Sequence, residues 1–172
     1  IDKIKKYLTS RKTGSEDWIH FNRRPELVSN KDTEYKKRIC FFTSVDWDAA
    51  LHFENSCFES QFDFLENYLE AAKANPEIEF NIRVHPAEES GFHPSSYSIS
   101  RFITERCDDI SSNVQIIHAG NTASSYDIAD QMDLCVIYNT KLGIELCAAG
   151  KRTIVAGDAW VKGRGFTWDL KG

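Results

Sequence analysis

The residues Arg38-Ile39-Cys40-Phe41-Phe42-Thr43-Ser44 decide the fold, because they form a short apolar run that ends in two hydroxyl side chains. A run of this length and composition is typical of a β-strand that is buried on both faces of a sheet. Four further apolar runs follow along the chain. The predicted strands therefore cover residues 38–44, 77–84, 114–118, 133–138 and 152–156.

Helical patterns separate these strands. Apolar residues recur at helical spacing between Gln61 and Asn75, and Pro76 then ends the pattern. Strands that alternate with helices are typical of a parallel sheet covered by helices on both faces. We therefore predict a Rossmann-like α/β domain over residues 37–172, with helices over 61–75, 96–106, 124–131 and 141–149.

Residues 1–36 are polar and mixed, and they lack this alternation. Residues 1–10 fit a helix, whereas residues 13–37 have the composition of loops and turns. We interpret the segment as a linker or as the edge of a missing neighbouring domain. Both ends of the sequence fit a piece of a longer protein.

The composition excludes several classes of function. The chain has 172 residues, of which 41% are hydrophobic and 27% charged, and its net charge is -5. An acidic chain is a poor general binder of nucleic acid, which needs a basic face. No apolar run approaches the ~20 residues of a membrane-spanning helix, and residues 1–11 lack the apolar core of a secretory leader. Five cysteines without a C-x-x-C motif favour buried free thiols in a reducing compartment, and hence a cytoplasmic protein.

Known cofactor and nucleophile motifs are missing from the sequence. It contains no G-x-G-x-x-G loop, no G-x-x-x-x-G-K-[ST] loop and no G-x-S-x-G elbow. His52, His93 and His118 do not share metal-ligand spacing with carboxylates or cysteines. We therefore expect neither a resident cofactor nor a metal.

Ligands of parallel α/β sheets bind outside the carboxyl ends of the strands. The residues that follow each strand are small, polar or basic: Thr43-Ser44, then 83–88, 120–125, 139–140 and 157–158. Asp46-Trp47-Asp48, after the first strand, has groups for sugar stacking or for loop packing. This edge of the sheet is the predicted binding site.

The segment from Arg83 to Glu88 ends the second strand with His85-Pro86. Pro86 cannot continue the hydrogen-bond ladder, so the chain turns and places His85 at the edge of the sheet. There the imidazole can donate to a phosphate oxygen, with Arg83 on the same face of the strand. A structural alternative is that His85 caps a neighbouring loop.

The segment 138–145 joins the fourth strand to a helix. Asn139 or Thr140 is a candidate N-cap, and the start of the helix beside Lys141 attracts phosphate. Gly143 permits close approach of a backbone, and Glu145 can reach ribose hydroxyls. The alternative is an ordinary capped helix.

Two further segments contain candidate ligand groups. Ser124 and Asp127 have the S-x-x-D form of a capping box, and the hydroxyls of Ser124 and Ser125 can also face a ligand. Residues 157–166 are rich in glycine and basic side chains. This loop is either a lid over a phosphate or a solvated connection, and its candidate contacts are Asp158, Lys162 and Arg164.

Together, the segments 83–88 (RVHPAE), 125–127 (SYD), 138–145 (YNTKLGIE), 154–158 (IVAGD) and 163–168 (GRGFTW) resemble the carboxy-terminal half of capsular-polysaccharide biosynthesis glycosyltransferases. The resemblance covers residues 38–168. It implies a GT-B enzyme, in which two Rossmann-like domains face a cleft and the second binds a nucleotide-sugar donor without an essential metal. The His-Pro element is similar to that of bacterial Kdo transferases and sialyltransferases, whose histidine contacts the donor phosphate.

The resemblance also assigns roles to residues. It makes His85 the leading donor-binding residue and gives Glu145 the place of the acidic residue that contacts the donor ribose or sugar. Those families often have a serine pair where this chain has Asn139-Thr140, so both CMP- and UDP-linked donors stay open. The general base usually lies in the other domain, so the fragment alone should bind donor and transfer poorly. The implied partners are the nucleotide-sugar, a glycan acceptor and the missing amino-terminal domain.

Other classes of function fit parts of the pattern. A non-catalytic Rossmann-like scaffold needs no role for His85. A sugar-nucleotide epimerase half shares the GT-B-like architecture. A phosphate-sensing, flavodoxin-like domain needs an aspartate at the end of the first strand, where this chain has Thr43-Ser44.

Overall fold

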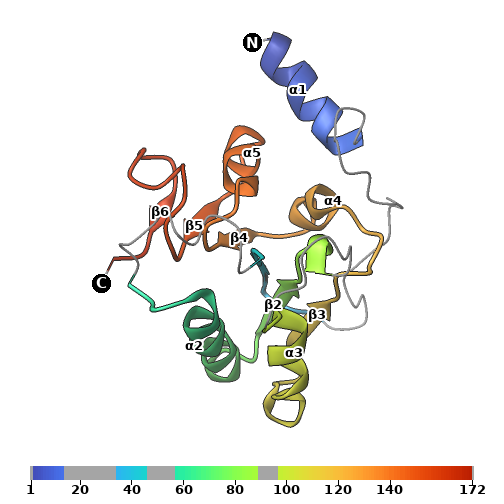
Figure 1. Ribbon diagram of the computed structural model, residues 1–172, viewed down its shortest axis with the longest axis vertical. Helices are drawn as coiled ribbons and strands as arrows, with labels where there is room; N and C mark the ends of the chain where they lie inside the picture. The colour runs from blue at the N-terminus through green and yellow to red at the C-terminus, as the bar shows by residue number, and fades with distance from the viewer. Residues whose placement is uncertain (1, 14–33, 46–56, 89–96, 172) are drawn as a thin grey trace.

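The computed structural model describes residues 2–13, 34–45, 57–88 and 97–171 (Figure 1). Six parallel strands form one sheet in the order β3-β2-β1-β4-β5-β6. This order confirms the predicted Rossmann-like α/β fold. The strands are β1 (Lys37–Phe42), β2 (Ile78–Arg83), β3 (Val114–Ile117), β4 (Leu134–Ile137), β5 (Thr153–Val155) and β6 (Trp168–Asp169).

The first strand lies at the centre of the sheet. From β1 the chain adds β2 and β3 on one side, and it then returns to place β4 on the other side of β1. The carboxyl ends of β1 and β4 therefore flank the point where the strand order reverses. Ligands of open α/β sheets bind at this point, so the fold itself marks a position for the site.

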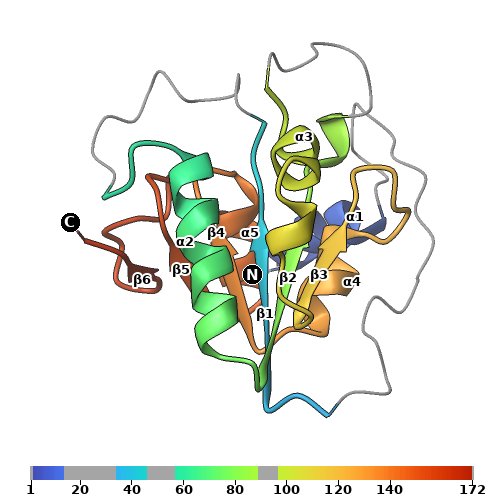
Figure 2. The same cartoon turned by 90° about the horizontal axis from the view of Figure 1, so that it is seen from below.

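Helices cover both faces of the sheet (Figure 2). On one face, α2 (Gln61–Ala74) and α3 (Ile99–Thr104) cover a cluster built around Phe41, Ile82 and Val84. On the other face, α4 (Ser125–Asp130) and α5 (Leu142–Ala148) cover a cluster that contains Phe42 and Ile137. Side chains alternate across each strand, so Phe41 and Phe42 belong to different clusters.

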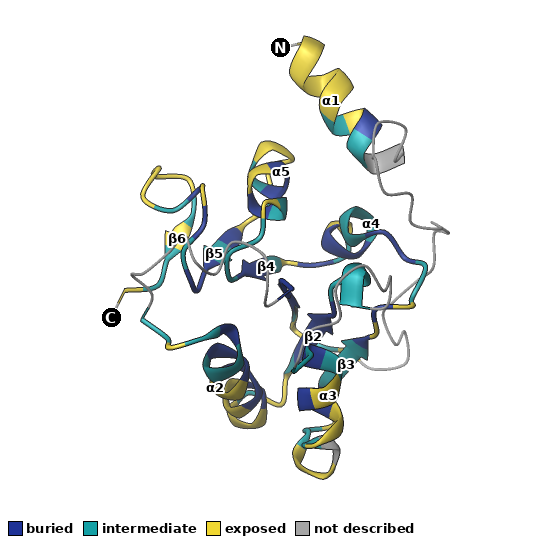
Figure 3. Ribbon diagram, in the orientation of Figure 1, coloured by how far each residue is buried: buried dark blue, intermediate teal, exposed yellow. Residues whose placement is uncertain are grey.

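Helix α2 shows how the sequence sets its own boundaries. Its N-cap is Ser60, whose side chain accepts a hydrogen bond from the backbone of Asp63. At its other end, the buried amide of Asn113 donates to the carbonyls of Ala72, Asn75 and Ile78. Figure 3 shows the buried side of α2 turned to the sheet and an exposed outer side, as the amphipathic spacing predicts.

The amino-terminal helix α1 (Asp2–Thr13) is longer than the predicted 1–10. It is mostly exposed (Figure 3), and its Tyr7 and Arg11 side chains reach Glu145 in α5. Helix α3 is shorter than the predicted 96–106. The described ranges also include β6, which the sequence did not predict, and two short 3-10 turns, η2 (Pro86–Glu88) and η3 (Cys107–Asp109). No helix in these ranges is long and apolar enough to span a bilayer.

Candidate functional site

The carboxyl end of β1 supplies two hydroxyl side chains to the point where the strand order reverses. Thr43 donates its hydroxyl to the carbonyl of Arg83 and accepts a hydrogen bond from the backbone of His85 at 3.0 Å. The side-chain amide of Gln61 binds both backbone groups of Ser44: it accepts from Ser44 N–H and donates to the Ser44 carbonyl. The Ser44 hydroxyl is buried and has no hydrogen-bond partner among the described residues. A buried hydroxyl in this state marks a place where a ligand or water can bind.

His85 follows β2 at the same edge and is half-buried. The backbone N–H of Ala87, within η2, donates to Nδ1 of His85 at 3.1 Å. Since Nδ1 accepts this hydrogen bond, the neutral imidazole carries its proton on Nε2. The turn created by Pro86 thus fixes the tautomer, and it makes the opposite side of the ring a hydrogen-bond donor.

Arg83, predicted to bind the donor, is engaged elsewhere in this structure. It is 3% exposed, and its guanidinium donates to the backbone carbonyls of His118, Asn121 and Ala123. These carbonyls belong to the loop between β3 and α4. Arg83 therefore attaches that loop to the end of β2, so it shapes the edge of the sheet from within.

Glu88 also has a local structural role. Its carboxylate accepts hydrogen bonds from the backbone N–H groups of Ile99 and Ser100 and from the Ser100 hydroxyl. These are the first N–H groups of α3, which lack partners inside the helix. A carboxylate at this position also interacts favourably with the helix dipole.

Ser124 is the N-cap of α4, as the capping-box pattern predicts. Its hydroxyl accepts from the backbone of Tyr126, rather than from Asp127 as in a full capping box. Ser125 is the first residue of the helix and is half-buried. Thr122, just before it, has a buried hydroxyl that lacks a partner among the described residues.

The connection from β4 to α5 departs from the predicted cap. The N-cap position falls on Lys141, which makes no side-chain capping bond, instead of on Asn139 or Thr140. Thr140 contributes its hydroxyl as the acceptor for Leu142 N at 3.3 Å. Lys141 is exposed and Asn139 is half-buried, so the lysine is the cation of this segment that solvent and ligands can reach.

Gly143 serves the packing of α5 on the sheet. A Cβ at this position would lie 2.3 Å from Cδ1 of Ile137 and 3.3 Å from Cγ2 of Val161. The sequence predicted that Gly143 allows a close approach of the backbone. In the structure, the backbone of α5 makes this approach to Ile137 of β4.

Glu145 is buried, with 4% of its surface exposed, and it lies between three helices. Its carboxylate accepts from Nε of Arg11 at 2.8 Å, from the Tyr126 hydroxyl at 2.6 Å and from the Tyr7 hydroxyl at 3.2 Å. Burial and the carboxylate raise the pKa of Tyr126 well above its usual value, so this hydroxyl stays a donor. In this structure the groups on Glu145 come from α1 and α4.

The loop after β5 is anchored at several points. Ala159 and Val161 are buried in the second cluster. Lys162 donates to the carbonyl of Gly157 at 2.9 Å and lies 3.9 Å from the carboxylate of Asp158. Arg164 is exposed. The segment predicted as a lid is therefore anchored up to Lys162, with Trp160 exposed within that part and residues 163–166 exposed after it.

The structure brings together part of the predicted site. His85, Thr43 and Ser44 lie at adjacent strand ends, and Arg83 links them to the loop before α4. Ser44 and Thr122 lie in the segments predicted to form the binding edge, but the lack of hydrogen-bond partners for their hydroxyls among the described residues becomes visible only in three dimensions. Asp46-Trp47-Asp48 lies outside the described residues. Among the residues that are described, no group of three or more His, Cys, Asp or Glu is placed to hold a metal ion.

Comparison with known proteins places this arrangement in context. Two solved structures share the fold: Thermosulfurimonas dismutans KpsC, beta Kdo 2,4 transferase (TM-score 0.66, 20% identity, 99% of this chain and 48% of that chain), and Thermosulfurimonas dismutans KpsC, beta Kdo 2,7 transferase (TM-score 0.55, 19% identity, 98% and 45%). The chain thus spans about half the length of these structures. No curated protein matches it. The family model for capsule polysaccharide biosynthesis proteins matches residues 6–172, and the chain belongs to that family.

Proposed function

We propose that this chain is the nucleotide-sugar-binding domain of a metal-independent GT-B glycosyltransferase that builds a capsule or surface polysaccharide. Membership of the capsule polysaccharide biosynthesis family supports a role in capsule synthesis. The two similar structures are named as transferases, which supports glycosyl transfer as the reaction. In this proposal a second Rossmann-like domain supplies the acceptor site and the general base. The enzyme would work in the cytoplasm, where nucleotide-sugars are made.

The observation that carries the proposal is the hydrogen bond from the Ala87 backbone N–H to Nδ1 of His85. Glycosyl transfer leaves negative charge on the departing nucleotide phosphate, and an enzyme without a metal must stabilise that charge with its own donors. Nε2–H of His85 is such a donor, because the Ala87 N–H holds Nδ1 as an acceptor. The backbone of His85 is bound to Thr43 at the end of β1, one of the two strands that flank the reversal of strand order, where the fold favours ligand binding.

Other groups complete the proposed site. Lys141 supplies an exposed positive charge, and the Ser44, Thr122 and Ser125 hydroxyls supply neutral donors. Arg83 acts as a positioning residue, because its guanidinium binds the loop that carries Thr122. A contact from Glu145 to a donor ribose stays a prediction, and it would require the α1 side chains to leave the carboxylate.

A thermal-shift panel with CMP, UDP, GDP and ADP tests the proposal. A ligand at 100 times its dissociation constant adds about 2.7 kcal/mol to the free energy of unfolding. For a chain of this size, that gain raises Tm by roughly 5–10 °C. One nucleotide should produce the shift, and the base that works also decides between CMP- and UDP-linked donors.

Two variants of His85 make the panel specific. His85→Ala should lose the shift, whereas His85→Gln, which keeps an N–H donor, should retain part of it. Glu88→Gln is the matched control, because Glu88 lies in the same turn and binds α3 instead. A shift that survives in His85→Ala would favour a scaffold with no role for the imidazole, and a shift lost equally in all three variants would indicate a general disturbance of the turn.

A further inference from the structure

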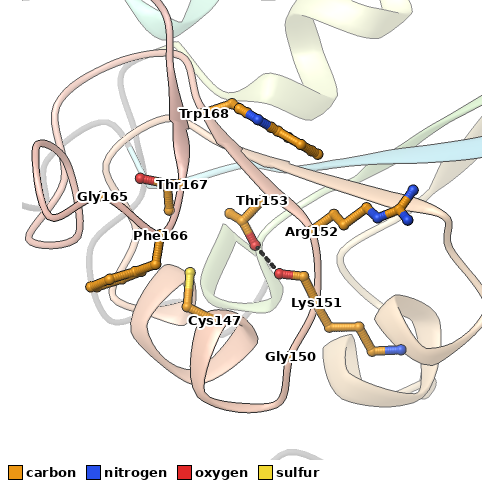
Figure 4. A pocket seen from close by; sticks show the side chains of 9 residues that line it. All are labelled: Cys147, Gly150, Lys151, Arg152, Thr153, Gly165, Phe166, Thr167 and Trp168. Atoms are coloured by element: carbon orange, nitrogen blue, oxygen red, sulfur yellow. Dashed lines mark hydrogen bonds between the residues drawn. The ribbon is translucent and has the colours of Figure 1, made fainter.

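A second candidate site lies in a cavity of about 360 Å³ beside α5 (Figure 4). Its volume is at the small end of the range for ligand pockets, about 300–1,000 Å³. Lys151 and Arg152 line it from just before β5 and Thr153 from the first position of β5, while Phe166 lines it from the approach to β6 and Trp168 from β6 itself. Cys147 of α5 points into the space between Thr153 and Phe166 (Figure 4).

This cavity is separate from the site around His85. Thr153 is the first residue of β5, and Cys147 lies in the last turn of α5. The cavity is therefore at the amino ends of the strands, whereas His85 and Ser44 follow the carboxyl ends of theirs. A ligand here would contact none of the residues proposed to bind the donor.

Two aromatic rings of the cavity are exposed to solvent. Phe166 is 58% exposed and Trp168 is 57% exposed, and neither belongs to a core cluster. Exposed aromatic side chains that line a concave place on the surface can form part of a ligand-binding groove. A flat ring that is exposed at its face can stack on the apolar face of a sugar ring, as aromatic side chains in wet binding sites do.

The charge of the cavity selects an anionic ligand. Its lining contains Lys151 and Arg152 but no acidic side chain, although the whole chain carries a net charge of -5. Lys151 pairs with Asp130 at 2.8 Å. Arg152 is exposed, and within the described residues its guanidinium has no ion pair or hydrogen bond. The nearby carboxylate of Asp169 is held by Thr167 and by the backbone of Gly163.

The layout favours an extended ligand over a single ion. In Figure 4 the Lys151 and Arg152 side chains extend to one side of the cavity, and Phe166 lies at the opposite side. An isolated anion would use the cations alone and leave the rings unexplained. A chain of sugars with carboxylate groups can place one ring against an aromatic side chain and a carboxylate against Arg152.

We propose that this cavity is an accessory site for a carboxylated oligosaccharide, which holds part of an acidic glycan away from the transfer site. The position of the site rests on the cavity alone, while the choice of a glycan rests on the proposed function. Such a site would keep a growing acidic polymer on the enzyme between additions, because a second contact raises the effective concentration of the chain end.

Calorimetric titration with an α2,8-linked tetramer of sialic acid tests the proposal. Trp168→Ala and Arg152→Gln should each weaken binding about tenfold, which is equivalent to about 1.4 kcal/mol. Trp160→Ala and Arg164→Gln are matched controls, because Trp160 is 70% exposed and Arg164 is exposed, yet neither lines the cavity. Both controls should bind as the unchanged chain does. Bound tetramer should also slow the alkylation of Cys147.

Comparison ligands identify the chemistry of the site. Maltotetraose, a neutral glycan, and poly-glutamate, an anion without sugar rings, should both bind at least about tenfold more weakly than the sialic acid tetramer. Equal binding of poly-glutamate would overturn the role of the aromatic rings. Equal binding of maltotetraose would overturn the role of the charge. Absence of tetramer binding would overturn the site, as would preferential binding of phosphatidylglycerol vesicles through Trp168.

The nucleotide panel separates this proposal from the proposed function. A nucleotide shift that depends on His85, without tetramer binding, would refute the accessory site alone. Tetramer binding that depends on Trp168, without a nucleotide shift, would refute donor binding alone. A cooperative thermal unfolding transition without ligand shows that Trp168→Ala and Arg152→Gln are folded, whichever of the two proposals fails.

Discussion

Replacing Gly143 by alanine tests whether this residue serves packing or ligand approach. The new Cβ would lie 2.3 Å from Cδ1 of Ile137 and 3.3 Å from Cγ2 of Val161. Ile137 is 0% exposed and Val161 is 3% exposed, so neither side chain can move into solvent. Overpacking costs about 1–3 kcal/mol, and alanine in place of glycine within a helix returns up to about 1 kcal/mol. The net loss in free energy of unfolding should be about 1–2 kcal/mol.

A double-mutant cycle isolates the contact. Ile137→Val removes the Cδ1 atom, and alone it should cost about 0.5–1.5 kcal/mol. In the Gly143→Ala background the same change removes the clash, so it should cost less or even stabilise the chain. Urea unfolding of the four proteins should give a coupling energy of at least about 0.5 kcal/mol.

Gly150→Ala is the control for the cycle. Gly150 has a φ of +77° and nothing within 4 Å of its Cβ position, so its substitution strains only the backbone and should be additive with Ile137→Val. Additive energies for Gly143→Ala as well would refute the packing argument. A stable double variant that no longer binds nucleotide would instead indicate that Gly143 serves the ligand.

Three more predictions follow from buried polar groups. Arg83→Met should lower the free energy of unfolding by about 2–4 kcal/mol, because the carbonyls of the loop before α4 lose a buried charged donor. Urea titration measures this loss. Asn67→Ala, which removes an exposed hydrogen bond, should cost far less in the same titration. Arg11→Ala should lower the free energy of unfolding by about 1–3 kcal/mol, because it leaves the buried Glu145 carboxylate without its cation. Adding Glu145→Gln should recover part of this stability. A double variant less stable than Arg11→Ala alone would contradict this. Burial raises the pKa of Cys135 from 9.0 to about 12, and burial also raises the pKa of Cys40. As the pH rises, these thiols therefore lose their protons at lower pH in the unfolded chain than in the folded chain. Their contribution to the free energy of unfolding should be fully present below pH 9. Between pH 9 and 12 the free energy of unfolding should fall by up to about 1.4 kcal/mol per pH unit for each thiol. Chemical unfolding at several pH values checks the slope, which Cys135→Ala should reduce.

Much of the fold was predictable because its information is local. The predicted strands 38–44 and 133–138 agree with β1 and β4 to within two residues at each end, since buried parallel strands are continuous apolar runs. Strand β6 was not predicted, because Trp168–Asp169 has only two residues and its pairing comes from β5. The predicted N-cap of α5 was displaced to Lys141 for a similar reason, because helix ends depend on tertiary contacts.

The candidate site depended more on long-range contacts. The edge position of His85 followed from Pro86, but its tautomer depends on the Ala87 N–H, which only the folded turn brings to the ring. Two of the three partners of Glu145, Tyr7 and Arg11, come from α1, more than 130 residues away in sequence. No local pattern predicts such a contact. Side chains with an edge position were therefore predictable, while the choice among their possible partners was not.

The central position of β1 also sets an order for folding. Ile39 pairs with Phe80 of β2, about 40 residues away, and with Leu134 of β4, about 95 residues away. Doubling the length of a closed loop adds only about 0.6 kcal/mol of entropy, but distant pairings slow folding. The β1-β2-β3 half should therefore form first and β4 should join it late. A nascent chain would lack the crevice between β1 and β4 until that last step, so donor binding would report completion of the domain during synthesis.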